Sequence, residues 1–392
     1  MRAMVMAAGV GSRLEPLTCN IPKPMVPVVN RPAMAHIIDL LKRHGIFEVV
    51  ANLWYLPHVI ENYFGDGRDF GIHLEYSKED TLLGTAGGVR QARHYFDGTF
   101  VLIAGDALTD IDLTALVEFH RSKRALATIA LKPVDDPSRF GVVVTEGDGR
   151  IVRFQEKPRP GEAASNLANT MIYVFEPGIF DFIPGEGTPD FGRDVFPLLV
   201  AERVPFYGYP ISDYWCDIGT LAQYRRAHYD VLAGRVRIEM PGGRGDGSHG
   251  GGDVRHGDGE SENYGGVAAG LWIGEGARIA SDARLMSPVV VGRGSMIRPG
   301  AVIGPNTVVG DGCIIDEGAV ISGSVIWSNT HVGRNACLTE CVVGSECYLG
   351  SGASVGEGVV LSDECVVEDA SRIKPNVRIW PRGTVRSKVS VW

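Results

Sequence analysis

Two glycines, an arginine and a lysine occur in one short stretch of the chain, where residues 8–18 read AGVGSRLEPLT and residues 22–24 read PKP. The stretch follows an apolar run at residues 3–7, which is typical of a buried strand. Glycines let main-chain amides approach an anion closely, and such a loop before a helix binds phosphate. Arg13 offers a planar guanidinium for phosphate oxygens, and Lys23 offers a mobile ammonium. Phosphate binding is therefore the chemistry predicted here.

Two common phosphate-binding motifs do not fit this stretch. A Walker A loop requires Gly-Lys-Ser/Thr after its first glycine, and none follows. A dinucleotide-binding loop requires Gly or Ala where this chain has Leu14.

Two aspartates are candidates for holding a metal ion. Asp106 ends the segment IAGD at 103–106, and Asp217 lies in YWCDIGT at 214–220. Each follows an apolar run, and Mg²⁺ prefers one or two carboxylates together with phosphate oxygens. Taken alone, each aspartate also fits a strand-end cap or a turn.

Two further segments carry groups that could contact a substrate. The segment FQEKP at 154–158 contains Glu156 and Lys157, which are alternatively an exposed charge pair on an edge strand. The segment LGTAGG at 83–88 could bring main-chain groups near Gly84 and Thr85 to a ligand. Alternatively, Thr85 caps a helix that continues through residues 89–95.

The combination of GxGSRLxPLT with Pro-Lys-Pro closely resembles the signature of the sugar-1-phosphate nucleotidyltransferases. The resemblance implies that Asp106 and Asp217 hold Mg²⁺, that Glu156 contacts sugar hydroxyls and that Lys157 contacts the sugar phosphate. It also implies that residues 83–88, called the base loop below, contact the nucleobase. It implies catalytic roles for Arg13, Lys23, Asp106, Lys157 and Asp217, and substrate contacts from Ala8, Gly9, Gly11, Gly84, Thr85, Gly87, Gly141, Glu156 and Asn169. The chain departs from the family shortly after Asn169, where the family often has a glycine and this chain has Thr170-Met171.

Within this family, the order and spacing of the motifs are most similar to those of the mannose-1-phosphate guanylyltransferases. That similarity implies transfer of GMP from GTP to mannose 1-phosphate, with release of pyrophosphate. Glucose-1-phosphate uridylyl-, thymidylyl- and adenylyltransferases share the same motifs and remain alternatives. In all of them the protein aligns a sugar phosphate with the α-phosphorus of an NTP and neutralises charge.

The composition, charge and cysteine content favour some classes of protein over others. The chain has 392 residues, 44% hydrophobic residues and a net charge of −9, which fits a globular protein better than one that binds nucleic acid. The apolar N-terminal run is interrupted by Gly9, Gly11 and Arg13, so it does not resemble a signal peptide, and no apolar run reaches the length of a membrane span. Seven cysteines without a compact pattern suggest reduced thiols and a cytoplasmic protein.

Strand and helix patterns alternate over residues 1–236. Strands are predicted at 48–53, 72–77, 100–106, 126–133 and 140–145, and helical spacing occurs at 34–41 and 113–117. Such alternation predicts an α/β domain with a mostly parallel, Rossmann-like sheet. The glycine loop and Asp106 both follow strands, and ligands bind at the carboxyl ends of strands in such sheets.

The sequence changes character after this domain. Residues 237–266 are dominated by glycine and polar residues and are predicted to be a flexible linker. From 267 to 392, aliphatic residues recur every six positions with two steps of five, and these positions include 297, 302, 308, 314 and 320. Hexapeptide repeats of this kind predict a left-handed parallel β-helix, here of about seven coils. Its stacked coils suggest a homo-oligomer assembled through this domain.

Two functions of other classes are less well supported. A non-catalytic regulatory subunit would be expected to lack Arg13, Lys23 or an aspartate of the pair, and all are present. A hexapeptide acyltransferase would need a histidine base, and His331, the only histidine of the repeat region, has no obvious partner in the sequence. Cys337, Cys341 and Cys347 lack the paired spacing of a zinc site and are predicted to be small buried thiols.

Overall fold

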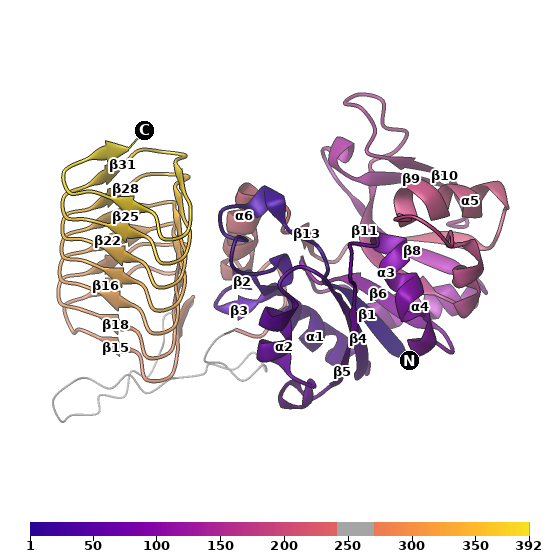
Figure 1. The fold of residues 1–392 in the computed structure, drawn as a ribbon, viewed down its shortest axis with the longest axis horizontal. Coiled ribbons are helices and arrows are strands. Elements are labelled where there is room, and N and C mark those ends of the chain that lie inside the picture. Colours follow the sequence, from indigo (N-terminus) through magenta and orange to yellow (C-terminus); the bar gives the residue numbers. More distant parts are fainter. Residues whose placement is uncertain (241–269, 392) are drawn as a thin grey trace. The chain divides into compact units, whose positions relative to one another are not determined.

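The computed structural model describes residues 1–240 and 270–391 (Figure 1). Most of the predicted linker at 237–266 therefore lies outside the described residues. Contacts between residues divide the chain into two units. The first contains Met1–Val10, Pro22–Met25 and Ala33–Asp217, and the second contains Gly11–Ile21, Val26–Pro32 and Ile218–Trp392. The predicted domain boundaries at 236 and 267 stay predictions.

The first unit is built on one nine-stranded sheet. Its main path runs β10-β9-β11-β6-β1-β4-β5, while β8 pairs with β11 and β12 pairs with β8. The strands are β1 (Arg2–Met6), β4 (Glu48–Leu53), β5 (His73–Lys78), β6 (Phe100–Ala104), β8 (Ala127–Pro133), β9 (Gly141–Thr145), β10 (Ile151–Glu156), β11 (Leu167–Phe175) and β12 (Phe206–Pro210). The short strands β7 (Ala107–Thr109) and β13 (Trp215–Asp217) form a separate pair, and β2 (Pro27–Val28) pairs with β3 (Arg31–Pro32) in the second unit.

The apolar runs of the sequence become the central strands. β1 lies between β4 and β6 and is parallel to both, and every residue of β6 is buried. Strands with buried residues on both faces are expected to read as continuous apolar runs. The predicted α/β fold class is confirmed, and the sheet is mixed, because β11 runs antiparallel to β6 and β8.

Short helices connect these strands. The α-helices are α1 (Ala33–Arg43), α2 (Pro57–Phe64), α3 (Thr85–Gln91), α4 (Leu113–Ser122), α5 (Phe196–Ala201) and α6 (Leu221–Leu232), the last belonging to the second unit. A π-helical turn, η7 (Phe191–Val195), precedes α5 directly. Across the described part of the chain, no helix combines the length and apolarity that crossing a bilayer requires.

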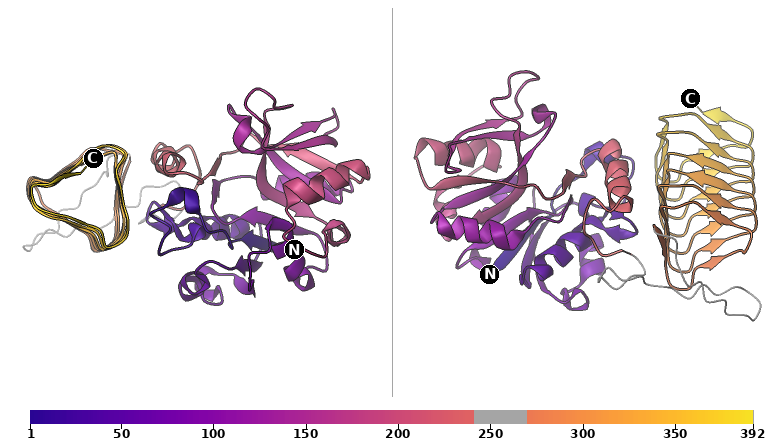
Figure 2. Two further views of the ribbon diagram at one scale, coloured as in Figure 1. Left: turned by 45° about the horizontal axis from the view of Figure 1, so that its top comes forward. Right: turned by 180° about the vertical axis from the view of Figure 1, so that it is seen from behind.

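The second unit contains 21 short strands in three parallel sheets of seven strands each. Seen end-on, the coils superimpose as a triangle (Figure 2). The first sheet holds β14 (Leu271–Ile273), β17 (Val289–Val291), β20 (Thr307–Val309), β23 (Val325–Ile326), β26 (Val342–Val343), β29 (Val360–Leu361) and β32 (Arg378–Ile379). The second holds β15 (Arg278–Ile279), β18 (Met296–Ile297), β21 (Ile314–Ile315), β24 (His331–Val332), β27 (Tyr348–Leu349), β30 (Val366–Val367) and β33 (Thr384–Val385). The third holds β16 (Arg284–Leu285), β19 (Val302–Ile303), β22 (Val320–Ser322), β25 (Cys337–Thr339), β28 (Ser354–Val355), β31 (Arg372–Ile373) and β34 (Ser390–Val391).

The β-helix predicted from the six-residue period is confirmed, but one part of its register is wrong. The sequence placed residues 302, 308, 314 and 320 inside, whereas the core contains the next residue in each case: Ile303, Val309, Ile315 and Ile321. Val320 is 43% exposed. The error arose because two adjacent residues of each strand are aliphatic there, so the period determined the spacing but not which of the two neighbours points inward. The first five-residue step therefore falls between Ile321 and Ile326.

Three predictions about side chains of the β-helix have mixed outcomes. Cys341 and Cys347 are buried thiols as predicted, whereas Cys337 is exposed. His331 has a partner that the sequence did not reveal, because its Nε2 lies 2.8 Å from Asp316 Oδ2 on the preceding coil.

Helix α6 packs within the second unit through a buried tyrosine. The Tyr224 hydroxyl donates to the Pro27 carbonyl at 2.7 Å and accepts from Trp327 Nε1 at 2.8 Å. Burial raises the pKa of Tyr224, so the phenol stays protonated and available for both hydrogen bonds.

Candidate functional site

A lysine and two aspartates meet in the first unit. The Lys23 ammonium bonds Asp106 Oδ2 and lies 3.3 Å from Asp217 Oδ1. Lys23 is only 9% exposed, and the two aspartate side chains are 22% and 23% exposed. Burial by itself would lower the pKa of Lys23, but the two carboxylates more than offset this effect and raise it. Lys23 is therefore a fixed positive charge at neutral pH.

A small antiparallel ribbon brings the two aspartates together. Asp106 follows β6, and β7 begins at the next residue. β13 pairs with β7 so that Asp217 lies opposite Ala107, the direct neighbour of Asp106. Two carboxylates that are 111 positions apart in sequence thus converge on one cation, as expected for side chains gathered at the carboxyl end of a sheet.

The two aspartates have the donor chemistry that a divalent cation requires. They already converge on one positively charged group, and Mg²⁺ is commonly held by one or two carboxylates with phosphate and water completing its shell. Among residues 1–240 and 270–391, no group of three or more His, Cys, Asp or Glu side chains comes together to hold a metal.

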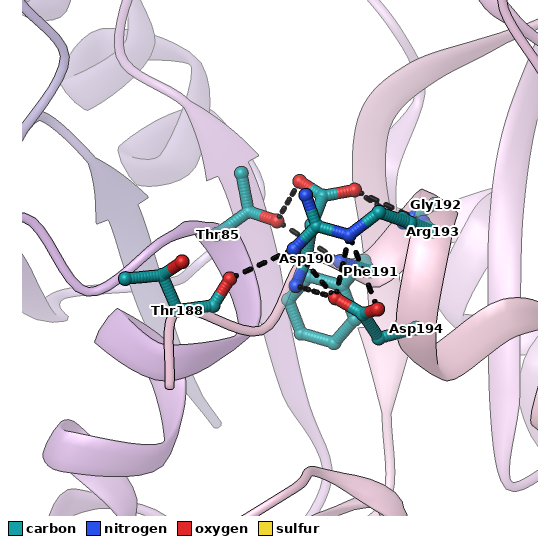
Figure 3. Close-up of polar contacts among 7 residues, drawn as sticks. All are labelled: Thr85, Thr188, Asp190, Phe191, Gly192, Arg193 and Asp194. Atoms are coloured by element: carbon teal, nitrogen blue, oxygen red, sulfur yellow. Dashed lines mark hydrogen bonds and ion pairs between the residues drawn. The ribbon is translucent and has the colours of Figure 1, made fainter. Parts of the chain in front are cut away.

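The predicted base loop begins helix α3. The N-cap residue of this helix is Gly84, and no side chain makes a capping hydrogen bond there. The alternative in which Thr85 caps the helix is therefore wrong. The Thr85 hydroxyl instead donates to Asp190 Oδ2 at 2.7 Å (Figure 3). The amides of Ala86 and Gly87 donate to the Pro189 carbonyl, because the loop lies directly against residues 188–190.

The predicted sugar-contacting residues lie on the antiparallel part of the sheet. Glu156 ends β10, opposite Gly141 in β9. Lys157 has a positive φ of 40° and a side chain that is 68% exposed, with its ammonium 3.4 Å from Glu156 Oε1. This backbone bend lets neighbouring residues of one strand end, Glu156 and Lys157, bring their charges together.

Glycine is required beside the Glu156 carboxylate. A Cβ atom at Gly141 would lie 2.8 Å from Glu156 Oε2, and one at Gly192 would lie 2.5 Å from the same oxygen. Real Cβ atoms do not approach other atoms so closely, so both positions must lack a side chain for Glu156 to keep this place. Gly192 belongs to the π-helical turn η7, and sequence reasoning did not find it.

Asn169 is 9% exposed and is held by its own strand. Its Nδ2 donates to the Tyr173 hydroxyl at 2.8 Å, and its Oδ1 accepts from the Met171 amide at 3.0 Å. The register between β11 and β8 shifts between Asn169 and Tyr173, and Met171 has a φ of 60°. Asn169 thus stabilises a bulge at the place where the chain departs from the family pattern. Its contact with a sugar stays a prediction.

The remaining predicted residues lie in and after the glycine loop. Ala8 is buried and Gly9 is exposed directly after β1, in the first unit. Gly11 has a φ of 76° and precedes the short 3₁₀ turn Ser12–Leu14, in which Arg13 is exposed. Gly11 and Arg13 belong to the second unit. Phosphate binding by these four residues stays a prediction.

Sequence reasoning missed a buried polar chain that connects the glycine loop with the base loop. Asn52 Oδ1 accepts from the Ala7 amide at 2.9 Å, and Asn52 Nδ2 donates to Glu79 Oε1 at 2.7 Å. Glu79 Oε2 in turn accepts from the Leu83 amide at 2.9 Å. The signal was present, because a buried amide and a buried carboxylate at the ends of neighbouring strands need partners.

Comparisons with known proteins show the family to which the chain belongs. The family model described as "Nucleotidyl transferase" matches residues 2–234, and the model described as "GMPPB C-terminal domain" matches residues 285–391. A UTP–glucose-1-phosphate uridylyltransferase from Synechocystis sp. is 42% identical over 257 residues, which are 62% of this chain and 66% of that protein. The chain thus spans just under two thirds of that relative's length.

Two further relatives are similar to this chain, one in sequence and one in structure. A mannose-1-phosphate guanylyltransferase from Mycobacterium tuberculosis is 36% identical over 74% of this chain and 79% of its own length. A crystal structure from Bacillus anthracis, assigned as a glucose-1-phosphate thymidylyltransferase, matches with a TM-score of 0.56 at 27% identity over 61% of this chain and 98% of that one. With a family model over more than half of its residues and these relatives, the chain belongs to the nucleotidyl transferase family, as the resemblance of its signature loop predicted.

Proposed function

We propose that this protein transfers a nucleoside monophosphate from an NTP to a sugar 1-phosphate and releases pyrophosphate, with GTP and mannose 1-phosphate as its preferred pair. The observation that carries the reaction type is the convergence of Lys23, Asp106 and Asp217 on one point. The relative from M. tuberculosis and the C-terminal match at 285–391 support the choice of GTP and mannose 1-phosphate.

The chain's own residues would mainly bind and orient the two phosphates. The sugar phosphate is already a nucleophile, so alignment and charge neutralisation are the main tasks of the protein. Lys157 carries an exposed ammonium that can meet the sugar phosphate, while Glu156 accepts hydrogen bonds from sugar hydroxyls. Arg13 is exposed in its turn and is proposed to bind the triphosphate.

Asp106 and Asp217 would hold Mg²⁺ in this proposal. When bound, the ion supplies charge neutralisation at the phosphates that react. Lys23 bonds both carboxylates, so it keeps them in place and limits their repulsion. In this proposal its ammonium also supplies a positive charge close to the phosphates.

The base loop favours guanine or uracil over adenine. The Leu83 amide is bound by Glu79, the Ala86 and Gly87 amides are bound by Pro189, and no acceptor among the described residues is assigned to the amides of Gly84 and Thr85. These donors suit a base carbonyl, which guanine and uracil have and adenine lacks. A base that leaves polar groups unpaired is rejected by about tenfold to a hundredfold for each contact.

UTP with glucose 1-phosphate is the second candidate pair. The 42% identity with the uridylyltransferase from Synechocystis sp. favours it, and the base-loop donors are compatible with uracil as well.

Pyrophosphate release with each NTP and each of mannose and glucose 1-phosphate tests the proposal. We expect the highest kcat/KM for GTP with mannose 1-phosphate and a requirement for Mg²⁺. The Asp217→Asn variant should lose turnover by about a hundredfold or more, because neutralisation of charge in the transition state contributes several kcal/mol. Asp213→Asn, at a half-buried position shortly before β13, is the control and should retain activity.

Two results would change or contradict this proposal. A higher kcat/KM for UTP with glucose 1-phosphate replaces the first substrate pair with the second. Near-normal turnover of Asp217→Asn at saturating Mg²⁺ contradicts the proposed role of the aspartates.

A further inference from the structure

The π-helical turn η7 contacts both predicted substrate-binding segments of the first unit. Gly192, within this turn, lies against the Glu156 carboxylate, and Pro189 and Asp190, just before it, bond the start of helix α3. π-Helical turns are rare and are often found at functional sites. The proposed reaction assigns no role to this turn.

Asp190 organises the turn through both of its carboxylate oxygens (Figure 3). Oδ1 accepts from the amides of Gly192 at 2.9 Å and Arg193 at 3.1 Å, which caps the turn. The Asp190 amide donates to Asp194 Oδ2 at 2.8 Å, so the cap is reciprocal. Oδ2 is thereby left to accept from the Thr85 hydroxyl at 2.7 Å.

The Thr85 hydroxyl both donates to this segment and accepts from it. It donates to Asp190 and accepts from the Phe191 amide at 3.0 Å. A hydroxyl has one hydrogen to donate, so Thr85 cannot donate to a nucleobase while this bond exists. The Thr85 side chain therefore holds the loop in place, and hydrogen-bond donation to a base carbonyl at this point is left to the main-chain amides.

We propose that Asp190 is a positioning residue that binds Thr85 and caps the η7 turn, and thereby holds the base loop and the sugar-contacting Glu156 in register with one another. This inference rests on the proposed function, because it assigns the two segments to the base and to the sugar. It assigns no contact with substrate to Asp190 or to the Thr85 hydroxyl.

Two substitutions test the bond between Asp190 and Thr85 and the cap of the η7 turn. Thr85→Val removes the hydroxyl but leaves the cap of the turn, so it should raise the KM for the NTP by about tenfold, the effect of one lost hydrogen bond to a charged group. Asp190→Asn keeps an oxygen for the cap but puts an amide where Thr85 needs an acceptor. It should raise the KM for the NTP to a similar extent and also raise the KM for the sugar phosphate.

The remaining variants test the coupling. Because Thr85 and Asp190 act through one bond, the double variant should lose no more NTP affinity than the worse single variant. Thr85→Ser retains the hydroxyl and should restore the wild-type KM. Asp112→Asn is the matched control, because Asp112 caps α4 by accepting from the Ala115 amide at 3.0 Å and has no bond to the base loop.

Steady-state kinetics use whichever substrate pair the wild type turns over fastest, and titration calorimetry with the NTP alone gives a readout that is independent of turnover. Thermal unfolding of each variant shows that it folds. Unchanged NTP affinity in Thr85→Val, or additive losses in the double variant, would overturn the inference. A wild type that turns over no pair contradicts the proposed function instead, and the calorimetric comparison still decides the role of Asp190.

Discussion

Replacing Lys23 with methionine should make the stability of the protein depend on Mg²⁺. The Lys23 ammonium is buried between Asp106 and Asp217, and methionine has a similar length without the charge. Removing one partner of a buried ion pair costs about 3–5 kcal/mol, because the remaining charge stays desolvated. The aspartate side chains are 22% and 23% exposed, so water screens part of their repulsion and we expect a loss of ~3 kcal/mol.

The assay is thermal unfolding in EDTA and in millimolar MgCl₂. A loss of this size lowers the midpoint by roughly 6–12 °C for a unit of 150–250 residues. Mg²⁺ should restore more stability to Lys23→Met than to the wild type, because two uncompensated carboxylates bind a cation more tightly. Lys78→Met is the control, since Lys78 is 60% exposed beside Glu61 and an exposed ion pair contributes little. A Lys23→Met protein that is as stable as the wild type in EDTA, or that responds no more strongly to Mg²⁺, refutes this reasoning.

Three further predictions can be tested independently. Gly192→Ala places a Cβ 2.5 Å from Glu156 Oε2, so the carboxylate must shift, and the KM for the sugar phosphate should rise by about tenfold in steady-state assays. Burial lowers the pKa of His120 below its ordinary value of 6.5, so the stability that the neutral side chain contributes is present above pH 6.5 and is lost as pH falls. The free energy of unfolding of His120→Gln, measured by denaturant titration, should therefore depend less on pH than that of the wild type. Equal pH dependence of the two proteins contradicts this. Deleting residues 267–392 should change the oligomeric state in light scattering more than it changes the identity of the products, and a monomeric full-length protein argues against assembly through the β-helix.

The elements of the fold could be predicted where a residue pattern is compatible with only one local structure. β4 occupies 48–53 as predicted, because an apolar run with polar ends fits a buried parallel strand. Residues 302–321 of the β-helix had two solutions, since each strand there offers two adjacent aliphatic side chains and the period cannot choose between them. Only packing against neighbouring coils decides which side chain points inward.

The site was predictable residue by residue, but its pairings were not. Asp106, Asp217 and Lys23 could be named from motifs, but their meeting depends on the antiparallel pairing of β13 with β7, which the sequence does not signal. Asp190 escaped prediction for the same reason. Its bond to Thr85 joins residues 105 positions apart, and a lone aspartate before a phenylalanine reads as an ordinary turn residue.

If Asp190 positions the two substrate-binding segments, its substitution has a thermodynamic consequence that a purely local disturbance of the turn would not have. If the η7 turn couples the base loop to Glu156, the NTP raises the affinity for the sugar phosphate by the same factor by which the sugar phosphate raises the affinity for the NTP, because coupling between two binding sites is reciprocal. Asp190→Asn should reduce both factors equally, toward one. Lys157→Ala, which removes a predicted phosphate contact, should weaken sugar-phosphate binding with and without the NTP and leave the ratio between them unchanged. Calorimetric titration of each ligand in the presence of the other measures both factors directly, with transfer prevented by an NTP analogue that has a methylene group in place of the α–β bridging oxygen. Unequal changes in the two factors would mean that they do not describe one equilibrium, and an unchanged factor in Asp190→Asn would mean that the turn transmits nothing.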